Sequence, residues 1–175
     1  MENEALFKLS YGLYVTGVKT ENGFGGSCVD SIAQISHGDP PRVAFGSMNQ
    51  NFTTESIRKS GEFTLSVLGQ DVDPLVIANF GFQSARDPAV SKWNNVNNTL
   101  MDGIPVLDGA IAQIKLSVEE IILYDTHTLF LAAVKSAKFG ESDAKPLLYS
   151  EYLAGWKDKV FAAFGQYKKD RADQT

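Results

Sequence analysis

The chain has very few residues that could form covalent crosslinks or metal sites. Its 175 residues include one cysteine, Cys28, and two histidines, His37 and His127. A single cysteine excludes an internal disulfide, a cysteine-based zinc or iron–sulfur site and a redox CxxC pair. Long apolar runs are also lacking, since none approaches the ~20 residues that a membrane helix requires. The N-terminus has two acids and no apolar segment of the secretory type, so we expect a cytoplasmic protein.

Net positive charge is absent as well. The chain has 21 Asp and Glu residues against 16 Lys and Arg, a formal net charge of −5. An acidic chain is poorly suited to polyanions, so we predict no nucleic-acid partner and no attachment to anionic membranes. The hydrophobic share of 43% and the charged share of 21% are ordinary for one globular domain of this length.

No GxGxxG segment is present, which removes the signature of a dinucleotide-binding Rossmann fold. Short β-rich runs alternate instead with polar turns. Strands are predicted over residues 13–18, 27–36, 42–47, 63–68, 114–123 and 126–138. The last two are separated by a turn too short for a parallel crossover, and the doubled acid at 119–120 indicates a bulge. This order predicts a mainly β protein with short helices, built as an antiparallel barrel.

Helices are predicted at the sides of this barrel. Apolar spacing favours a short helix over residues 4–11. A second helix follows the polar turn 48–54 and ends near Ser60, just before Gly61. A third covers residues 73–80, with Asp73 as N-cap and Pro74 in the first helical position. Residues 81–103 show no periodicity and indicate a long, ordered functional loop.

Two polar or small-residue segments suggest a binding site. Residues 47–54, SMNQNFTT, place hydroxyls, amides and free backbone N–H groups at a helix N-terminus, where a phosphate is favoured. Capping by Asn51 or Thr53 explains one polar residue, but not six in eight. Residues 26–31, GSCVDS, would let a planar ligand approach the backbone, although a strand in a tight barrel would also use small residues. Cys28 is interpreted as a small buried hydrophobe rather than a nucleophile.

Four segments in this order, residues 25–36, 40–68, 126–134 and 145–155, resemble the flavin reductase-like family, whose members bind FMN in a split β-barrel. The resemblance implies an antiparallel, Greek-key-like split barrel over residues 1–155, with a closing strand within 145–155. Residues 156–175 would form a helical extension whose apolar face packs most simply against a second subunit. Some relatives continue into a rubredoxin domain with paired CxxC motifs, which this chain lacks.

The resemblance also implies individual site residues. The FMN phosphate would be held by Ser47, Asn49, Asn51, Thr53 and Thr54. The ring would lie against Ser27, Cys28, Val29, Asp30 and Ser31, although relatives have Asn where Gly25 or Asp30 stands. In the long loop, Arg86 and Lys92 would reach the phosphate or the O2 edge of the ring. His127 would lie beside the ring and the nicotinamide, and Tyr149 would flank the ring. Without the resemblance, His127 is an ordinary strand histidine and Tyr149 a core tyrosine.

The resulting expectation is an FMN-dependent oxidoreductase that takes a hydride from NADH or NADPH. It would pass the electrons to a free flavin, a rubredoxin-like carrier or another acceptor. A non-catalytic FMN-binding electron carrier is the main alternative, and a barrel that binds no flavin and serves as an interaction domain is the third. The apolar tail and the resemblance both predict a homodimer.

Overall fold

The computed structural model describes residues 3–172. Its main sheet has the strand order β2-β1-β6-β9-β10-β5-β4, with β3 paired to β1, and β7 and β8 form a separate pair. All of these pairings are antiparallel. The strands are β1 (Tyr14–Thr20), β2 (Gly23–Gly25), β3 (Cys28–Val29), β4 (Ile32–Ser36), β5 (Arg42–Met48), β6 (Glu62–Val67), β7 (Asn98–Met101), β8 (Ile104–Leu107), β9 (Ala112–Leu123) and β10 (His127–Phe139).

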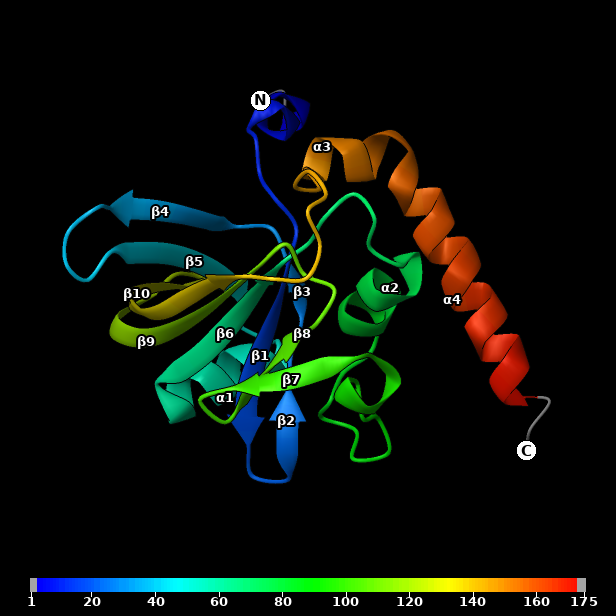
Figure 1. Ribbon diagram of the computed structural model, residues 1–175, viewed down its shortest axis with the longest axis horizontal. Helices are drawn as coiled ribbons and strands as arrows, with labels where there is room; N and C mark the ends of the chain where they lie inside the picture. The colour runs from blue at the N-terminus through cyan, green and yellow to red at the C-terminus, as the bar shows by residue number, and fades with distance from the viewer. Residues whose placement is uncertain (1–2, 173–175) are drawn as a thin grey trace.

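The helices surround this sheet. They are the 3-10 helices η1 (Asn3–Lys8) and η2 (Trp93–Asn95), the α-helices α1 (Phe52–Ser60), α2 (Pro74–Phe82), α3 (Tyr149–Glu151) and α4 (Lys157–Ala172), and the π-helical turn η3 (Tyr152–Trp156). Helices α2 and α4 lie side by side along one flank of the molecule (Figure 1). None of the helices described over residues 3–172 is long and apolar enough to cross a membrane.

The core has two apolar clusters. The first fills the barrel, where the ring centroid of Phe45 lies 5.5 Å from that of Phe63 and 5.9 Å from that of Phe130. Each fully buried side chain of this size stabilises the fold by roughly 1.5–3 kcal/mol. The second cluster lies beneath α2, where Phe80 meets Trp93 edge-on at 4.7 Å. The barrel strands and helix α2 are therefore each held by a buried apolar cluster.

Two of the three predicted helices are confirmed as α1 and α2, although α1 begins at Phe52 within the predicted turn and α2 continues to Phe82. The helix predicted over residues 4–11 is the shorter 3-10 helix η1. Helix α1 ends at Gly61, whose φ of 70° is left-handed and whose N–H donates to the Ile57 carbonyl. Helix α2 begins after Asp73, whose Oδ1 accepts the Leu75 N–H at 2.8 Å. The β9–β10 hairpin is confirmed as well, and its register shift leaves Glu119 without a partner on β10, as a bulge requires.

Three predicted elements differ from the structure. Residues 27–36 are not one strand, because β3 pairs with β1 and β4 with β5, so the chain leaves the ladder at Asp30 and Ser31. Residues 81–103 contain η2 and β7 rather than only irregular loop. Residues 145–155 form two isolated bridges and helical turns in place of a closing strand. Pro146 has no N–H to donate to a continuing ladder.

Of the predicted extension over residues 156–175, the last three residues lie outside the described part of the chain, and helix α4 packs part of its apolar face within the same chain. Val160 is fully buried in the second cluster. The rings of Phe161 and Phe164 lie 4.9 and 5.3 Å from the ring of Phe82 in α2. Helix α2 covers part of this apolar face, whereas Phe161 remains 53% exposed, so packing of the rest against a second subunit stays a prediction.

Candidate functional site

Three chain segments that are distant in sequence meet at one end of the sheet. The Gly46 N–H at the end of β5 donates to the Ser31 carbonyl at 2.9 Å. On the other side of β5, Met48 is paired in register with His127, the first residue of β10. Three segments thus lie together at this end of the sheet: the β3–β4 connection, the turn before α1 and the start of β10.

The turn before α1 presents unpaired donors. Asn51 is the N-cap residue and its side chain makes no cap hydrogen bond. Among residues 3–172, no acceptor is found for the backbone N–H groups of Phe52, Thr53 and Thr54, or for the Thr53 hydroxyl. Because these groups lie at the positive end of the helix dipole, they suit a phosphate.

Three other polar side chains of this turn are engaged within the protein. Ser47 Oγ lies 2.6 Å from Thr54 Oγ1, and Thr54 Oγ1 donates to the Met48 carbonyl at 2.7 Å. Asn49 donates from Nδ2 to the Tyr124 carbonyl at 2.8 Å and accepts the Thr128 hydroxyl at 2.7 Å. Of the five residues predicted to hold a phosphate, Asn51 and Thr53 have uncommitted side chains, whereas Ser47, Asn49 and Thr54 shape the turn.

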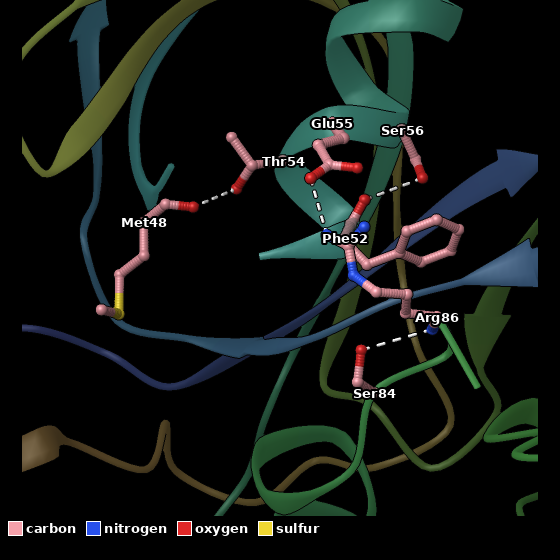
Figure 2. Close-up of polar contacts among 7 residues, drawn as sticks. All are labelled: Met48, Phe52, Thr54, Glu55, Ser56, Ser84 and Arg86. Atoms are coloured by element: carbon pink, nitrogen blue, oxygen red, sulfur yellow. Dashed lines mark hydrogen bonds and ion pairs between the residues drawn. The ribbon is translucent and has the colours of Figure 1, made fainter. Parts of the chain in front are cut away.

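Arg86 reaches from the long loop to the first turn of α1 (Figure 2). Its NH2 group lies 2.6 Å from Glu55 Oε1, and its guanidinium lies 5.4 Å from the centroid of the Phe52 ring. The backbone N–H of Arg86 donates to Ser84 Oγ at 3.3 Å. The hydrogen bond from Arg86 lowers the pKa of the Glu55 carboxyl. The ion pair with Glu55 therefore keeps the Arg86 guanidinium within one helical turn of the unpaired N–H groups.

The small-residue segment, residues 26–31, is hydrogen-bonded to β1 at its start. Two backbone N–H groups near its end have no protein acceptor among the described residues. The Ser27 N–H donates to Thr16 Oγ1 at 3.0 Å, and a Cβ added to Gly26 would lie 2.3 Å from the Thr16 carbonyl oxygen. In the part of the chain that the structure describes, the backbone N–H groups of Asp30 and Ser31 donate to no protein acceptor. Two unpaired backbone donors beside small side chains suit the polar edge of a flat ring.

Apart from Lys92, whose Nζ donates to the Gly26 carbonyl, the side chains around this segment are neutral or acidic. Burial, with a smaller effect of Asp30, raises the pKa of the Cys28 thiol to about 12, so the thiol is protonated and unsuited to nucleophilic attack. Val29, half-buried, is paired with Tyr14 of β1. Tyr149 is half-buried and stacks on Tyr152 at 5.8 Å. Burial, with a smaller effect of Asp30, raises the pKa of Tyr149.

Lys92 does not extend over the surface. Its side chain is 2% exposed, and Nζ donates to the Gly26 carbonyl at 2.9 Å and to the Phe80 carbonyl at 3.1 Å. The neighbouring Trp93 donates from Nε1 to the Gly25 carbonyl at 2.9 Å. The loop therefore supports the small-residue segment from behind, a role that sequence reasoning missed because carbonyl acceptors leave no signal in the sequence.

His127 is exposed at the edge of the site, and its Nδ1 lies 2.8 Å from Thr126 Oγ1. A cavity of about 790 Å³ lies along the other side of α1. Its lining includes Phe24, Phe52, Glu55, Arg86, Ser91 and Trp93. Arg86 and the first turn of α1 therefore line this cavity together.

Comparison with known proteins identifies one family for most of the chain. A protein family described as flavin reductase like domain matches residues 6–154. The chain is 32% identical to a high molecular weight rubredoxin of Moorella thermoacetica, over 100% of this chain and 70% of that protein. It is 30% identical to a ferric-chelate reductase (NAD(P)H) of Archaeoglobus fulgidus, over 91% of this chain and 94% of that protein.

A solved structure gives the same result for the fold. The styrene monooxygenase flavin reductase of Pseudomonas putida S12 superposes with a TM-score of 0.71 at 28% identity, covering 85% of this chain and 92% of that one. This likeness and the antiparallel sheet together confirm the predicted split-barrel fold class.

Proposed function

This chain belongs to the flavin reductase-like domain family and is a flavin reductase-like oxidoreductase, and we propose that FMN is the flavin it binds. NADH or NADPH donates the hydride, and a free flavin, a small rubredoxin-like protein or another acceptor takes the electrons. The flavin supplies the two-electron chemistry, while the protein binds and orients it.

One observation carries this proposal: donors for a phosphate and donors for a ring edge occur at the same end of the sheet. The first turn of α1 offers three backbone N–H groups and the Thr53 hydroxyl, with Arg86 adjacent. The N–H groups of Asp30 and Ser31 are unpaired next to β5, the strand that leads into this turn. The chemistry of these donors fits an anionic tail and a flat polar ring.

The choice of FMN over FAD is supported by the single phosphate-type turn. The chain has no GxGxxG dinucleotide motif, and α1 offers donors for one terminal phosphate. The pigment extracted from the purified protein, or bound after reconstitution, is identified by chromatography. We expect predominant FMN; predominant FAD, or no bound flavin at all, would contradict the proposal.

His127 is the side chain proposed to act on the reacting partners. It is exposed beside the turn before α1, where an imidazole can donate to developing charge or position a nicotinamide. Tyr149, half-buried at the start of α3, is proposed to flank the ring. The names of the reductase relatives favour this catalytic function over a non-catalytic electron carrier.

We also propose a homodimer that covers the edge beside His127. Apolar side chains are exposed there on β5 and on the β9–β10 hairpin, namely Met48, Ile121, Leu123 and Tyr124. A second copy would remove this surface from water. Light scattering at micromolar concentration is expected to give twice the chain mass of 19.1 kDa, and a monomer would contradict the dimer.

A further inference from the structure

Lys92 is a buried cation without a counter-ion. The loop that follows α2 brings its side chain behind the small-residue segment, where it is 2% exposed. Ion pairs within residues 3–172 engage Arg42, Lys59, Arg86 and Lys115, and none engages Lys92. Because an unpaired charge is costly to bury, a position of this kind needs an explanation beyond packing.

Hydrogen bonds within the protein satisfy only part of the donor capacity of the Lys92 ammonium group. Two of its three N–H groups donate to the Gly26 and Phe80 carbonyls, and the third has no acceptor within the described residues. The Phe80 ring centroid lies 5.8 Å from Nζ and adds a cation–π contact. Neutral carbonyl oxygens and a ring face leave the formal charge uncompensated.

The segment that Lys92 supports is the one proposed to carry the ring. Gly26 leads directly into Ser27 and Cys28, and Lys92 and Asp30 both act on the Cys28 thiol, with opposite effects on its pKa. That thiol is neutral at pH 7 and cannot serve as the missing anion. Tyr149 and Tyr152, which also face this region, have raised pKa values and are neutral too. Asp30 forms no ion pair with Lys92.

We propose that Lys92 is a positioning residue whose buried positive charge favours the reduced, anionic form of the bound flavin, acting through the Gly26–Cys28 segment. This inference rests on the proposed function, because it requires a flavin on that segment. Lys92 contacts this segment from the protein interior at the Gly26 carbonyl, where the effective dielectric constant is far below that of water. A reduced flavin carries the negative charge that the protein itself does not supply to Lys92, whereas an oxidised flavin is neutral in its ring.

The test compares two affinities in one protein. Oxidised FMN and dithionite-reduced FMN are titrated anaerobically into wild-type apoprotein, Lys92→Gln and Lys115→Gln. Glutamine retains a hydrogen-bond donor and removes the charge. Lys115 is the matched control because it is also nearly buried, 8% exposed, but is paired with Glu62 at 3.4 Å.

We expect Lys92→Gln to bind oxidised FMN within about threefold of wild type and reduced FMN at least ~10-fold more weakly, the scale of one charge acting at short range. A tenfold change in the ratio of the two affinities lowers the two-electron potential by about 30 mV. Lys115→Gln is expected to leave that ratio unchanged. An unchanged ratio in Lys92→Gln would overturn the inference.

A second measurement uses the wild-type protein and does not depend on the variant folding. The side-chain pKa of Lys92 is followed by NMR of selectively labelled lysine, in the apoprotein and in both flavin complexes. By linkage, the pKa of Lys92 is expected to be higher in the reduced complex than in the apoprotein by about one unit or more. Equal values in the apoprotein and the reduced complex would overturn the inference. Failure of the wild type to bind FMN in either form would instead refute the proposed function.

Discussion

The side chain of Asn49 donates to the Tyr124 carbonyl at 2.8 Å, and its backbone N–H donates to the Thr126 carbonyl at 2.9 Å. These bonds join the turn before α1 to the β9–β10 hairpin. His127 begins β10 immediately after that hairpin turn. The position of the proposed catalytic side chain is thus fixed by a residue that sequence reasoning had assigned to the phosphate.

Asn49→Ala is expected to destabilise the fold by about 1–3 kcal/mol, because it leaves carbonyls of the hairpin turn and the Thr128 hydroxyl without their partner. Urea unfolding of the apoprotein measures this loss. Asn51→Ala is the matched control: its side chain forms no hydrogen bond in the described protein, so its stability should stay within about 0.5 kcal/mol of wild type.

Thr53→Val should weaken FMN binding by roughly 1.5–3 kcal/mol, since it removes one hydrogen bond to a charged phosphate while keeping the shape of the side chain. Fluorescence titration of the apoprotein with FMN gives the dissociation constant. Riboflavin, which lacks the phosphate, is the matched probe, and its affinity should not change. Equal losses for FMN and riboflavin would show that Thr53 does not contact the phosphate.

The pKa of Lys92 is lowered to about 8 by burial, against 10.5 for a free side chain. Between these values the unfolded chain holds a proton that the folded protein lacks, so stability rises with pH. Between about pH 7.5 and 9.5, the titration of Lys92 is expected to increase the free energy of unfolding by roughly 2 kcal/mol. Urea unfolding of the wild-type apoprotein and Lys92→Met at both pH values isolates the contribution, and a parallel pH response in the two proteins would refute it.

His127→Ala should retain bound FMN and slow its reduction by NADH or NADPH, by roughly tenfold to a thousandfold, the scale of one donor or positioning group. Stopped-flow absorbance at saturating NADH measures the rate. Wild-type rates at normal flavin content would make His127 a structural residue. Loss of FMN would assign it to binding or folding instead.

Local signals in the sequence were sufficient for elements that depend on their own residues. Asp73 and Pro74 mark the start of α2, Gly61 marks the end of α1, and the doubled acid at 119–120 marks the bulge. The fold class followed from the order of these elements and from the family resemblance. Each of these features is decided by backbone preferences that act over a few residues.

Features that depend on distant partners were not predictable in the same way. The break at Asp30 and Ser31 arises because the chain changes from β1 to β5 as its neighbour. The inward direction of Lys92 depends on the carbonyls of Gly26 and Phe80, and every residue offers a carbonyl. The apolar face of α4 was expected at a subunit interface, because the sequence does not reveal that Phe82 lies opposite it.

The central claim is that this protein binds FMN and takes a hydride from a nicotinamide. The most direct test is the absorbance spectrum of the FMN-loaded protein, recorded anaerobically before and after addition of NADH and, separately, NADPH. We expect flavin absorbance that is bleached by at least one of the two donors. A protein that remains colourless after reconstitution, or whose bound FMN is bleached by dithionite and by neither nicotinamide, would contradict the account.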